Sequence, residues 1–410
     1  MSSPAADPAE PTAPAIGPWT RRATLPVTLF VQAASSAAVI APTVAAPLLL
    51  QRLQLGPAAV GVFIALVYLA AMFSSPLGAA LVRHFGPIRS SQLALLASAL
   101  GLALLLVPWL PAVALGALLV GVGYGPITPA SSQMLARTTA PRHYALVFSV
   151  KQTGVPLGGV IAGLLVPPLV VLGGATAAML GVALLCLAGL LAALPLAAGL
   201  DRDRDRGAAW PSLWQLAAPV RFVAAHPVLR SVALCSFIFS IVQVSLTSYM
   251  VTYLTTDLRW TLVAAGAALA VSQTAGVVGR IVWGLVADRW LGARRMLLVL
   301  ALAMAACGLL MPLLAPSTAA LPVLVLLCAF GATAVGWNGV YLATVARLVP
   351  QAQAATATAG TLFFTFFGVV IGPPLFGAAG TAFGALGPAF ALLALPLLAA
   401  LWSLGRGRWG

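Results

Sequence analysis

The chain is poor in charge of either sign and poorest in acid. Only seven of its 410 residues are Asp or Glu, and charged residues make up 7% of the total, against about a quarter in a soluble domain. Hydrophobic residues reach 61%, and the mean hydropathy is +1.06. These values exclude an ordinary soluble domain and indicate a membrane protein.

The basic residues do not follow the pattern of a nucleic-acid-binding protein. The formal net charge is +14, but no basic patch with interleaved aromatic residues is present. The arginines instead lie at the ends of apolar segments, where they set the topology of a membrane protein. We therefore expect the lipid bilayer as a partner and no nucleic acid.

Residue patterns for catalysis and metal binding are also lacking. The sequence has no Gly-x-Ser-x-Gly and no phosphate-binding Gly-x-x-x-x-Gly-Lys loop. The four cysteines all lie in apolar runs without ligand-like spacing, which favours a core role: Cys186, Cys235, Cys307 and Cys328. The sequence predicts a protein that is not an enzyme, with no metal site, no cofactor and no ATP-driven transport by this chain alone.

Apolar runs of about 20 residues, the length that crosses a bilayer, recur about twelve times. We predict an all-α membrane protein with twelve transmembrane helices in two pseudo-symmetric six-helix halves. No removable signal peptide is expected in the Ala/Pro-rich N-terminus. The predicted domains are a disordered tail (1–24), an N-terminal half (25–199), a central loop (200–227), a C-terminal half (228–404) and a C-terminal tail (405–410).

The arginines lie almost entirely on one set of connections, and only Arg52 and Arg259 fall on the opposite set. By the positive-inside rule, both termini are then cytoplasmic, as an even number of crossings also requires. We expect a multi-pass protein of a bacterial inner membrane. The central alternation of Asp and Arg over residues 201–206 predicts a solvated linker, because these charges can neutralise one another.

The two halves share internal repeats. At an offset of 206 residues, Gly78-x-x-x-Val82-Arg83-x-x-Gly86-x-x-Arg89 aligns with Gly284-x-x-x-Asp288-Arg289-x-x-Gly292-x-Arg294-Arg295. Gly154-x-x-x-Gly158-x-x-x-x-Gly163 matches Gly368-x-x-x-Gly372-x-x-x-x-Gly377, and Val122-Gly123-Tyr124 matches Val335-Gly336-Trp337. Lys151 then falls opposite the neutral Thr365.

Together these features resemble the major facilitator superfamily over the whole chain. The resemblance implies two six-helix halves and a glycine/Asp-Arg motif between helices two and three, repeated between helices eight and nine. Here the second copy keeps Asp288, whereas Val82 takes the acid position of the first. We expect Asp288 to pair with Arg289, Arg294 or Arg295, or to cap a helix, and Gly78 and Gly284 to allow close helix approach. The expected conformational latch comprises Gly78, Arg83, Gly284, Asp288, Arg289, Arg294 and Arg295.

Two cations lie well inside predicted spans, and no acid does. They are Lys151, the single lysine of the chain, and Arg280. A buried cation without a counter-ion is unfavourable unless an anion or a water-filled cavity compensates it, and the simplest such anion is a substrate. Snorkelling to the interface or pairing with backbone carbonyls are the alternative interpretations.

The segment Gly279-Arg280-Ile-Val-Trp-Gly284 is similar to the eighth span of the oxalate/formate and monocarboxylate transporter branches. There an arginine four residues before a glycine contacts the substrate carboxylate. The superfamily resemblance also implies that spans five and eight are neighbours. A guanidinium suits a carboxylate because it donates two parallel hydrogen bonds, whereas lysine acts as a point charge.

We therefore expect a monomeric secondary active or facilitative transporter, an antiporter or symporter, that moves a small organic anion, a carboxylate, by alternating access. Two alternatives remain within transport: the substrate is an inorganic anion such as nitrate or cyanate, or the protein exports amphipathic compounds. An alternative of another class is a membrane sensor. The resemblance implies that spans one, four, seven and ten line the cavity, Gln152 lies beside Lys151, and Gln273 shares a helix face with Arg280. The candidate substrate-binding residues are therefore Lys151, Arg280, Gln32, Tyr124, Thr128, Gln152, Gln243, Tyr249, Gln273, Trp337, Asn338 and Tyr341.

Overall fold

The computed structural model describes residues 17–140, 144–202, 204–205, 207, 210, 212–350 and 353–406. Within these ranges all regular structure is helical, as predicted. Ten helices are long and apolar enough to cross a membrane. The predicted N-terminal tail at 1–16 and the last four residues lie outside the described residues.

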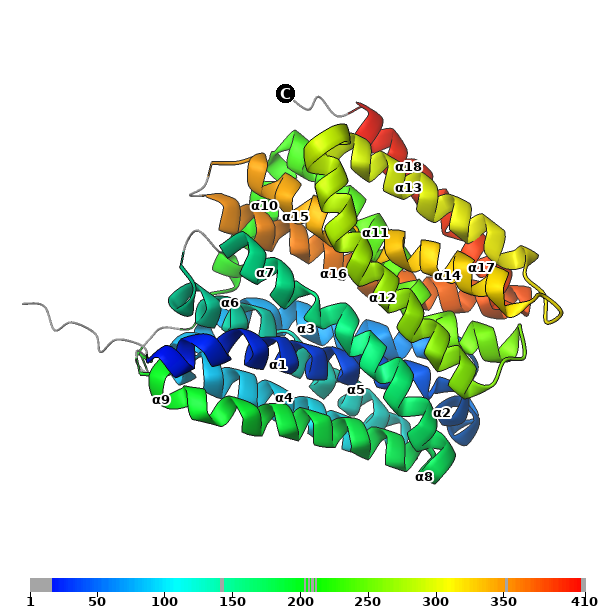
Figure 1. The fold of residues 1–410 in the computed structure, drawn as a ribbon, viewed down its shortest axis with the longest axis horizontal. Helices are drawn as coiled ribbons and strands as arrows, with labels where there is room; N and C mark the ends of the chain where they lie inside the picture. The colour runs from blue at the N-terminus through cyan, green and yellow to red at the C-terminus, as the bar shows by residue number, and fades with distance from the viewer. Residues whose placement is uncertain are drawn as a thin grey trace, which may run out of the picture.

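The N-terminal half, residues 17–202, forms the lower part of the molecule in Figure 1, coloured blue to green. Its helices are α1 (Pro18–Val44), α2 (Ala46–Leu53), α3 (Ala58–Phe85), α4 (Pro87–Leu104), α5 (Leu110–Tyr124), α6 (Ile127–Thr138), α7 (Tyr144–Gln152), α8 (Gly154–Ala193), the 3-10 turn η2 (Leu194–Leu196) and α9 (Ala197–Leu200).

The C-terminal half, residues 212–406, forms the upper part. Its elements are α10 (Leu213–Ala225), α11 (Pro227–Thr256), α12 (Leu262–Val286), the π-helical turn η3 (Ala287–Leu291), α13 (Gly292–Leu310), the 3-10 turn η4 (Met311–Leu313), α14 (Ala320–Ala334), α15 (Asn338–Arg347), α16 (Ala354–Phe383), α17 (Leu386–Leu392) and α18 (Ala394–Arg406).

Two of the ten candidate spans are far too long for one crossing. Val150–Leu200 and Leu262–Leu313 hold 51 and 52 residues, about 75 Å of helix at 1.5 Å per residue, against a hydrocarbon core of about 30 Å. In α8 the helical geometry is lost at Gly173 and Gly174, where Gly174 has φ +67°, and Figure 1 shows the chain reversing there. Leu262–Leu313 is interrupted by η3 and by Gly292, with φ +73°. Glycine suits both bends because it adopts positive φ without a Cβ clash.

Several long helices are interrupted where the sequence carries glycine, proline or aromatic residues. The α5–α6 helix breaks at Gly125-Pro126, and α14 is separated from α15 by residues 335–337. The first break directly follows the repeated segment Val122-Gly123-Tyr124, and the second is formed by its counterpart Val335-Gly336-Trp337. Breaks at this depth release backbone carbonyls, which is tolerated where they line a cavity or meet a polar partner.

The two halves make their closest backbone contacts away from the arginines. A Cβ on Gly61 of α3 would collide with the Pro373 carbonyl of α16, and one on Gly163 of α8 would collide with the Gly266 carbonyl of α12. The end of the molecule where α1 begins and α18 ends carries most of the arginines and is called the arginine-rich end below. Gly61 and Gly266 lie in the first turns of helices that begin at the opposite, arginine-poor end.

Some predicted boundaries were wrong. The first helix begins at Pro18 instead of residue 25, so residues 18–24 belong to a helix and not to a tail. The central region is not only a linker, because α10 occupies residues 213–225. Hydropathy alone cannot find such ends, since a polar first turn or a short amphipathic helix lowers the average of the window.

Candidate functional site

Arg280 of α12 joins the two halves. Its Nε donates to the Val335 carbonyl at 3.1 Å, and its Nη1 donates to the Gln152 carbonyl at 2.9 Å. Val335 lies in the break between α14 and α15, and Gln152 ends α7. Both acceptors are therefore carbonyls released at helix ends. A guanidinium has five N–H donors, so others remain available for a ligand.

Lys151 lies directly beside this contact. Its side chain is 1% exposed, and its Nζ donates to Gln152 Oε1 at 3.3 Å. Gln152 thus accepts from Lys151 with its side chain and from Arg280 with its backbone. The adjacency of spans five and eight that the resemblance implied is present. Because Lys151 is buried and Arg280 is partly exposed, Arg280 is the more accessible of the two cations.

The carboxylates of the described residues all lie elsewhere. Asp201 and Asp257 accept from backbone N–H groups at helix starts. Asp288 pairs with Arg347, and Asp205 is exposed. Among the residues that the structure describes, neither Lys151 nor Arg280 therefore has an acidic partner, and both contact Gln152 from different sides of that residue.

The N-terminal half lines this region with polar groups from α1 and α6. Thr128 Oγ1 donates to Gln32 Oε1 at 3.5 Å. The Gln32 amide nitrogen is buried and has no hydrogen-bond partner among the described residues. Gln32 packs against Gly154, where an added Cβ would lie 2.9 Å from Gln32 Cβ. Gly154 lies two residues after Gln152, so Gln32 brings an unused buried donor to this region, which an anion or a water can satisfy.

The C-terminal half contributes a hydrogen-bonded triad. Gln243 Oε1 accepts from Trp337 Nε1 at 2.8 Å and from Asn338 Nδ2 at 3.2 Å. Trp337 and Asn338 follow the α14 break, two and three residues after the carbonyl that Arg280 contacts. This triad holds the broken segment against α11, and Asn338 stays partly exposed.

An aromatic row crosses between the halves near Arg280. Tyr124 lies within electrostatic range of Arg280. Its ring meets Tyr68 of α3 edge-on, with centroids 5.7 Å apart, and Tyr68 meets Phe366 of α16 at 6.0 Å. Sequence reasoning missed Tyr68, because no repeat or motif marks it. Tyr124 was among the candidates because the superfamily resemblance implies that span four lines the cavity.

Two predicted site residues, Tyr249 and Gln273, lie apart from this cluster, and a third, Tyr341, packs against Trp337. The Tyr249 hydroxyl donates to the Pro373 carbonyl at 3.1 Å and packs at the contact between the halves. Gln273 packs on Gly159 of α8, and its buried Oε1 has no hydrogen-bond partner in the part of the chain that the structure describes. Tyr341 is 1% exposed and stacks edge-on with Trp337, with centroids 5.1 Å apart. The structure therefore groups Lys151, Arg280, Gln152, Gln32, Thr128 and Tyr124 on one side, continued by Gln243, Trp337 and Asn338.

The second glycine/Asp-Arg motif differs from expectation in its partners. Asp288 pairs with Arg347 of α15 at 2.8 Å, and not with Arg289, Arg294 or Arg295. Arg294 instead donates to the carbonyls of Leu404 and Gly405 in α18.

The two motif glycines also differ from each other. A Cβ on Gly78 would lie 2.7 Å from Pro129 Cγ, so Gly78 does allow close helix approach. Nothing lies within 4 Å of a Cβ on Gly284, so the same prediction was wrong there. Arg83 and Arg289 are both exposed at the arginine-rich end.

The first motif, which lacks an acid at Val82, obtains one from a distant segment. Asp201 Oδ1 accepts from Ile88 N at 2.8 Å, and Oδ2 accepts from Arg89 N at 3.1 Å. The carboxylate caps the N-terminus of α4 and is 6% exposed, so its assignment to a solvated linker was wrong. Burial raises the pKa of the Asp201 carboxyl, while these two N–H donors act in the opposite direction.

Comparison with known proteins identifies the family. The model of the Major Facilitator Superfamily matches residues 28–373. The chain belongs to this superfamily and is a multi-pass integral membrane transporter, not an enzyme. A comparison with curated proteins finds no match.

Solved structures show the same fold. A bacterial homologue of the human lysosomal transporter Spinster, inward-facing and unoccupied, is 18% identical, with 95% of each chain covered and a TM-score of 0.69. A variant of the nucleoside transporter NupG is 14% identical, with 94% of this chain and 99% of the other covered and a TM-score of 0.76. At these identities the likeness concerns the fold.

Proposed function

We propose that the protein is a secondary transporter of a small organic anion, a carboxylate, bound between the halves by Arg280 and Lys151. The observation that carries the proposal is the meeting of both cations at Gln152, with no carboxylate of the described residues in contact. Arg280 offers its free donors to the carboxylate. Lys151, buried behind Gln152, adds positive potential, and Gln32 supplies a further donor.

The same proposal includes the topology. The bends at Gly173-Gly174 and at η3–Gly292 divide the two overlong spans, which supports twelve crossings in two six-helix halves. The arginine-rich end is assigned to the cytoplasm by the positive-inside rule. Since the closest contacts between the halves lie near the other end, this assignment makes the present conformation inward-facing.

Alternating access follows from the charges. An empty site holds two uncompensated cations, and a bound carboxylate neutralises one of them while bridging groups from both halves. The loaded site therefore changes face more easily than the empty one. Because no carboxylate of the described residues lies in the site, anion exchange or a proton carried with the substrate is favoured over a protein carboxylate as proton carrier.

Counterflow in proteoliposomes tests this proposal. Liposomes preloaded with an unlabelled carboxylate should take up the labelled carboxylate with the wild-type protein. Uptake should fall strongly with Arg280→Gln and Lys151→Met, and it should persist with Arg52→Gln, which removes one exposed charge away from the site. Uptake of nitrate but of no carboxylate would replace the organic anion with an inorganic one. Wild-type uptake by both site variants would contradict the anion site.

A further inference from the structure

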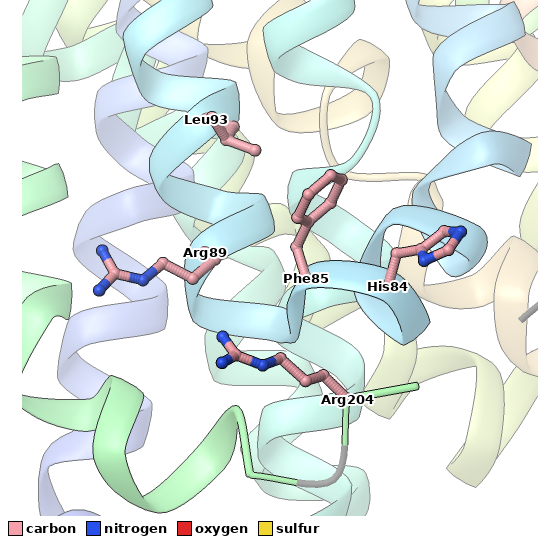
Figure 2. A pocket seen from close by; sticks show the side chains of 5 residues that line it. All are labelled: His84, Phe85, Arg89, Leu93 and Arg204. Carbon is pink, nitrogen blue, oxygen red and sulfur yellow. The ribbon is translucent and has the colours of Figure 1, made fainter. Parts of the chain in front are cut away.

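A second cationic feature lies outside the transport region, at the arginine-rich end of the N-terminal half. His84 and Phe85 end α3, Arg89 and Leu93 lie on α4, and Arg204 comes from the central linker; together they line a hollow of about 520 Å³. Figure 2 shows Arg89 and Arg204 on one side of it, with their guanidinium groups facing the same way, and Phe85 beside them. Neither the transport site nor the latch uses this hollow.

The hollow carries two arginine side chains that reach its surface. Arg89 and Arg204 are exposed, and the hydrogen bond found for the Arg89 side chain goes to the neutral Gln92 at 3.0 Å. Asp201, which lies within electrostatic range of both arginines, accepts from two backbone N–H groups of α4, and the exposed Asp205 follows Arg204 in the chain. A guanidinium group suits a phosphate, which it can bind through two parallel hydrogen bonds.

An apolar path leads away from these charges along α4. Phe85 is 43% exposed, and Leu93, Leu96 and Leu100 are 49%, 39% and 53% exposed. The leucines are spaced three and four residues apart, so they share one face of the helix. Because α4 is a candidate membrane span, this face meets lipid acyl chains. Trp210, 53% exposed, lies against His84 with ring centroids 5.0 Å apart, as is typical of aromatic residues at headgroup level.

We infer that this hollow is a binding site for an anionic phospholipid, with the phosphate on Arg89 and Arg204 and an acyl chain along Leu93, Leu96 and Leu100. A headgroup that bridges Arg204 and Arg89 fixes the central linker to the start of α4, next to the Asp201 cap. Bound lipid therefore stabilises the N-terminal half at its arginine-rich end.

The test measures thermal unfolding of the purified full-length protein in detergent, with added phosphatidylglycerol or with phosphatidylcholine of the same acyl chains. Phosphatidylglycerol should raise the unfolding temperature more than phosphatidylcholine does. The Arg89→Gln/Arg204→Gln variant should lose most of this difference and need at least tenfold more phosphatidylglycerol for the same shift. The control variant Arg22→Gln/Arg230→Gln, which removes two exposed charges, should keep the difference.

Two further arms separate a lipid from a soluble phosphate. Glycerol phosphate, which has the anion but no acyl chain, should give little stabilisation, and Leu93→Gln should weaken the response to phosphatidylglycerol. Equal stabilisation by glycerol phosphate, or equal responses of the wild type and the Arg89→Gln/Arg204→Gln variant, would overturn the lipid site. An equal loss in the control variant would show a response to net charge alone and would overturn it as well.

Discussion

Each half contributes one cation to the site, and the other half has a hydroxyl residue at the matching position. Lys151 corresponds to Thr365, and the offset of 206 residues that aligns Gly78 with Gly284 also aligns Arg280 with Ser74. Ser74 reaches the Gly121 carbonyl at 3.4 Å, beside the α5–α6 break, much as Arg280 reaches Val335 beside the α14 break. The scaffold is therefore repeated, whereas the charges are placed once in each half.

This difference separates packing from function. The hydroxyls of Ser74 and Thr365 satisfy nearby carbonyls within their own half. Arg280 instead reaches the other half, and Lys151 lies at that contact. Exchanging cations for hydroxyls should therefore remove function while sparing the fold.

The largest effect is expected from Arg280→Ser, which gives the C-terminal half the residue of its N-terminal counterpart. Loss of a guanidinium from a carboxylate contact costs about 3 kcal/mol, so carboxylate kcat/KM should fall roughly 100-fold. Arg280→Lys keeps the charge without the planar guanidinium, so its kcat/KM should lie between those of the wild type and Arg280→Ser. Counterflow at several substrate concentrations measures both, and equal rates for Arg280→Ser and the wild type would disprove the contact.

The second effect is that of Lys151→Thr, which copies Thr365 into the N-terminal half. Transport should fall about tenfold, because the lost charge acts from behind Gln152 and not by direct contact. The unfolding temperature should rise, since an uncompensated buried charge is removed. The reciprocal variant Thr365→Lys adds a buried charge and should lower the unfolding temperature. A lower unfolding temperature for Lys151→Thr would show that a counter-ion was overlooked.

The third comparison concerns the two motif acids. Asp201→Ala leaves two N–H groups at the start of α4 without their acceptor and should destabilise the protein by about 2 kcal/mol. Asp288→Ala breaks an ion pair whose side chains are 56% and 63% exposed, which contributes less than about 1 kcal/mol. Thermal unfolding in detergent ranks the two variants. The reverse order would mean that the Asp288–Arg347 pair is the stronger connection.

The smallest effects come from the motif glycines. Gly78→Ala places a methyl group 2.7 Å from Pro129 Cγ and should lower the unfolding temperature by several degrees, because α3 must move away from the α5–α6 break. Gly284→Ala has open space and should be neutral or slightly stabilising, since alanine favours a helix over glycine. A similar decrease of the unfolding temperature in both variants would indicate that another helix packs against Gly284 in a different conformational state.

Apolar run length was enough to predict the helical membrane fold, and charges within apolar runs marked Lys151 and Arg280. The superfamily was predicted through the resemblance that the repeated glycine and Asp-Arg motifs carry. The meeting of Lys151 and Arg280 required the resemblance, since nothing local specifies which spans touch. The Asp201 cap could not be predicted, because Asp201 lies more than 100 residues from Ile88 within an alternating charge run. The partner of Asp288, Arg347, was missed for the same reason of sequence distance.

The central claim, that Lys151 and Arg280 form an anion site between the halves, is tested most directly by thermal unfolding of the purified protein with a panel of carboxylates. A carboxylate at about 100 times its Kd should stabilise the wild type by about 2.7 kcal/mol. The Lys151→Thr/Arg280→Ser variant should show no such shift. An equal shift in both proteins, or no shift of the wild type with any carboxylate, would contradict the account.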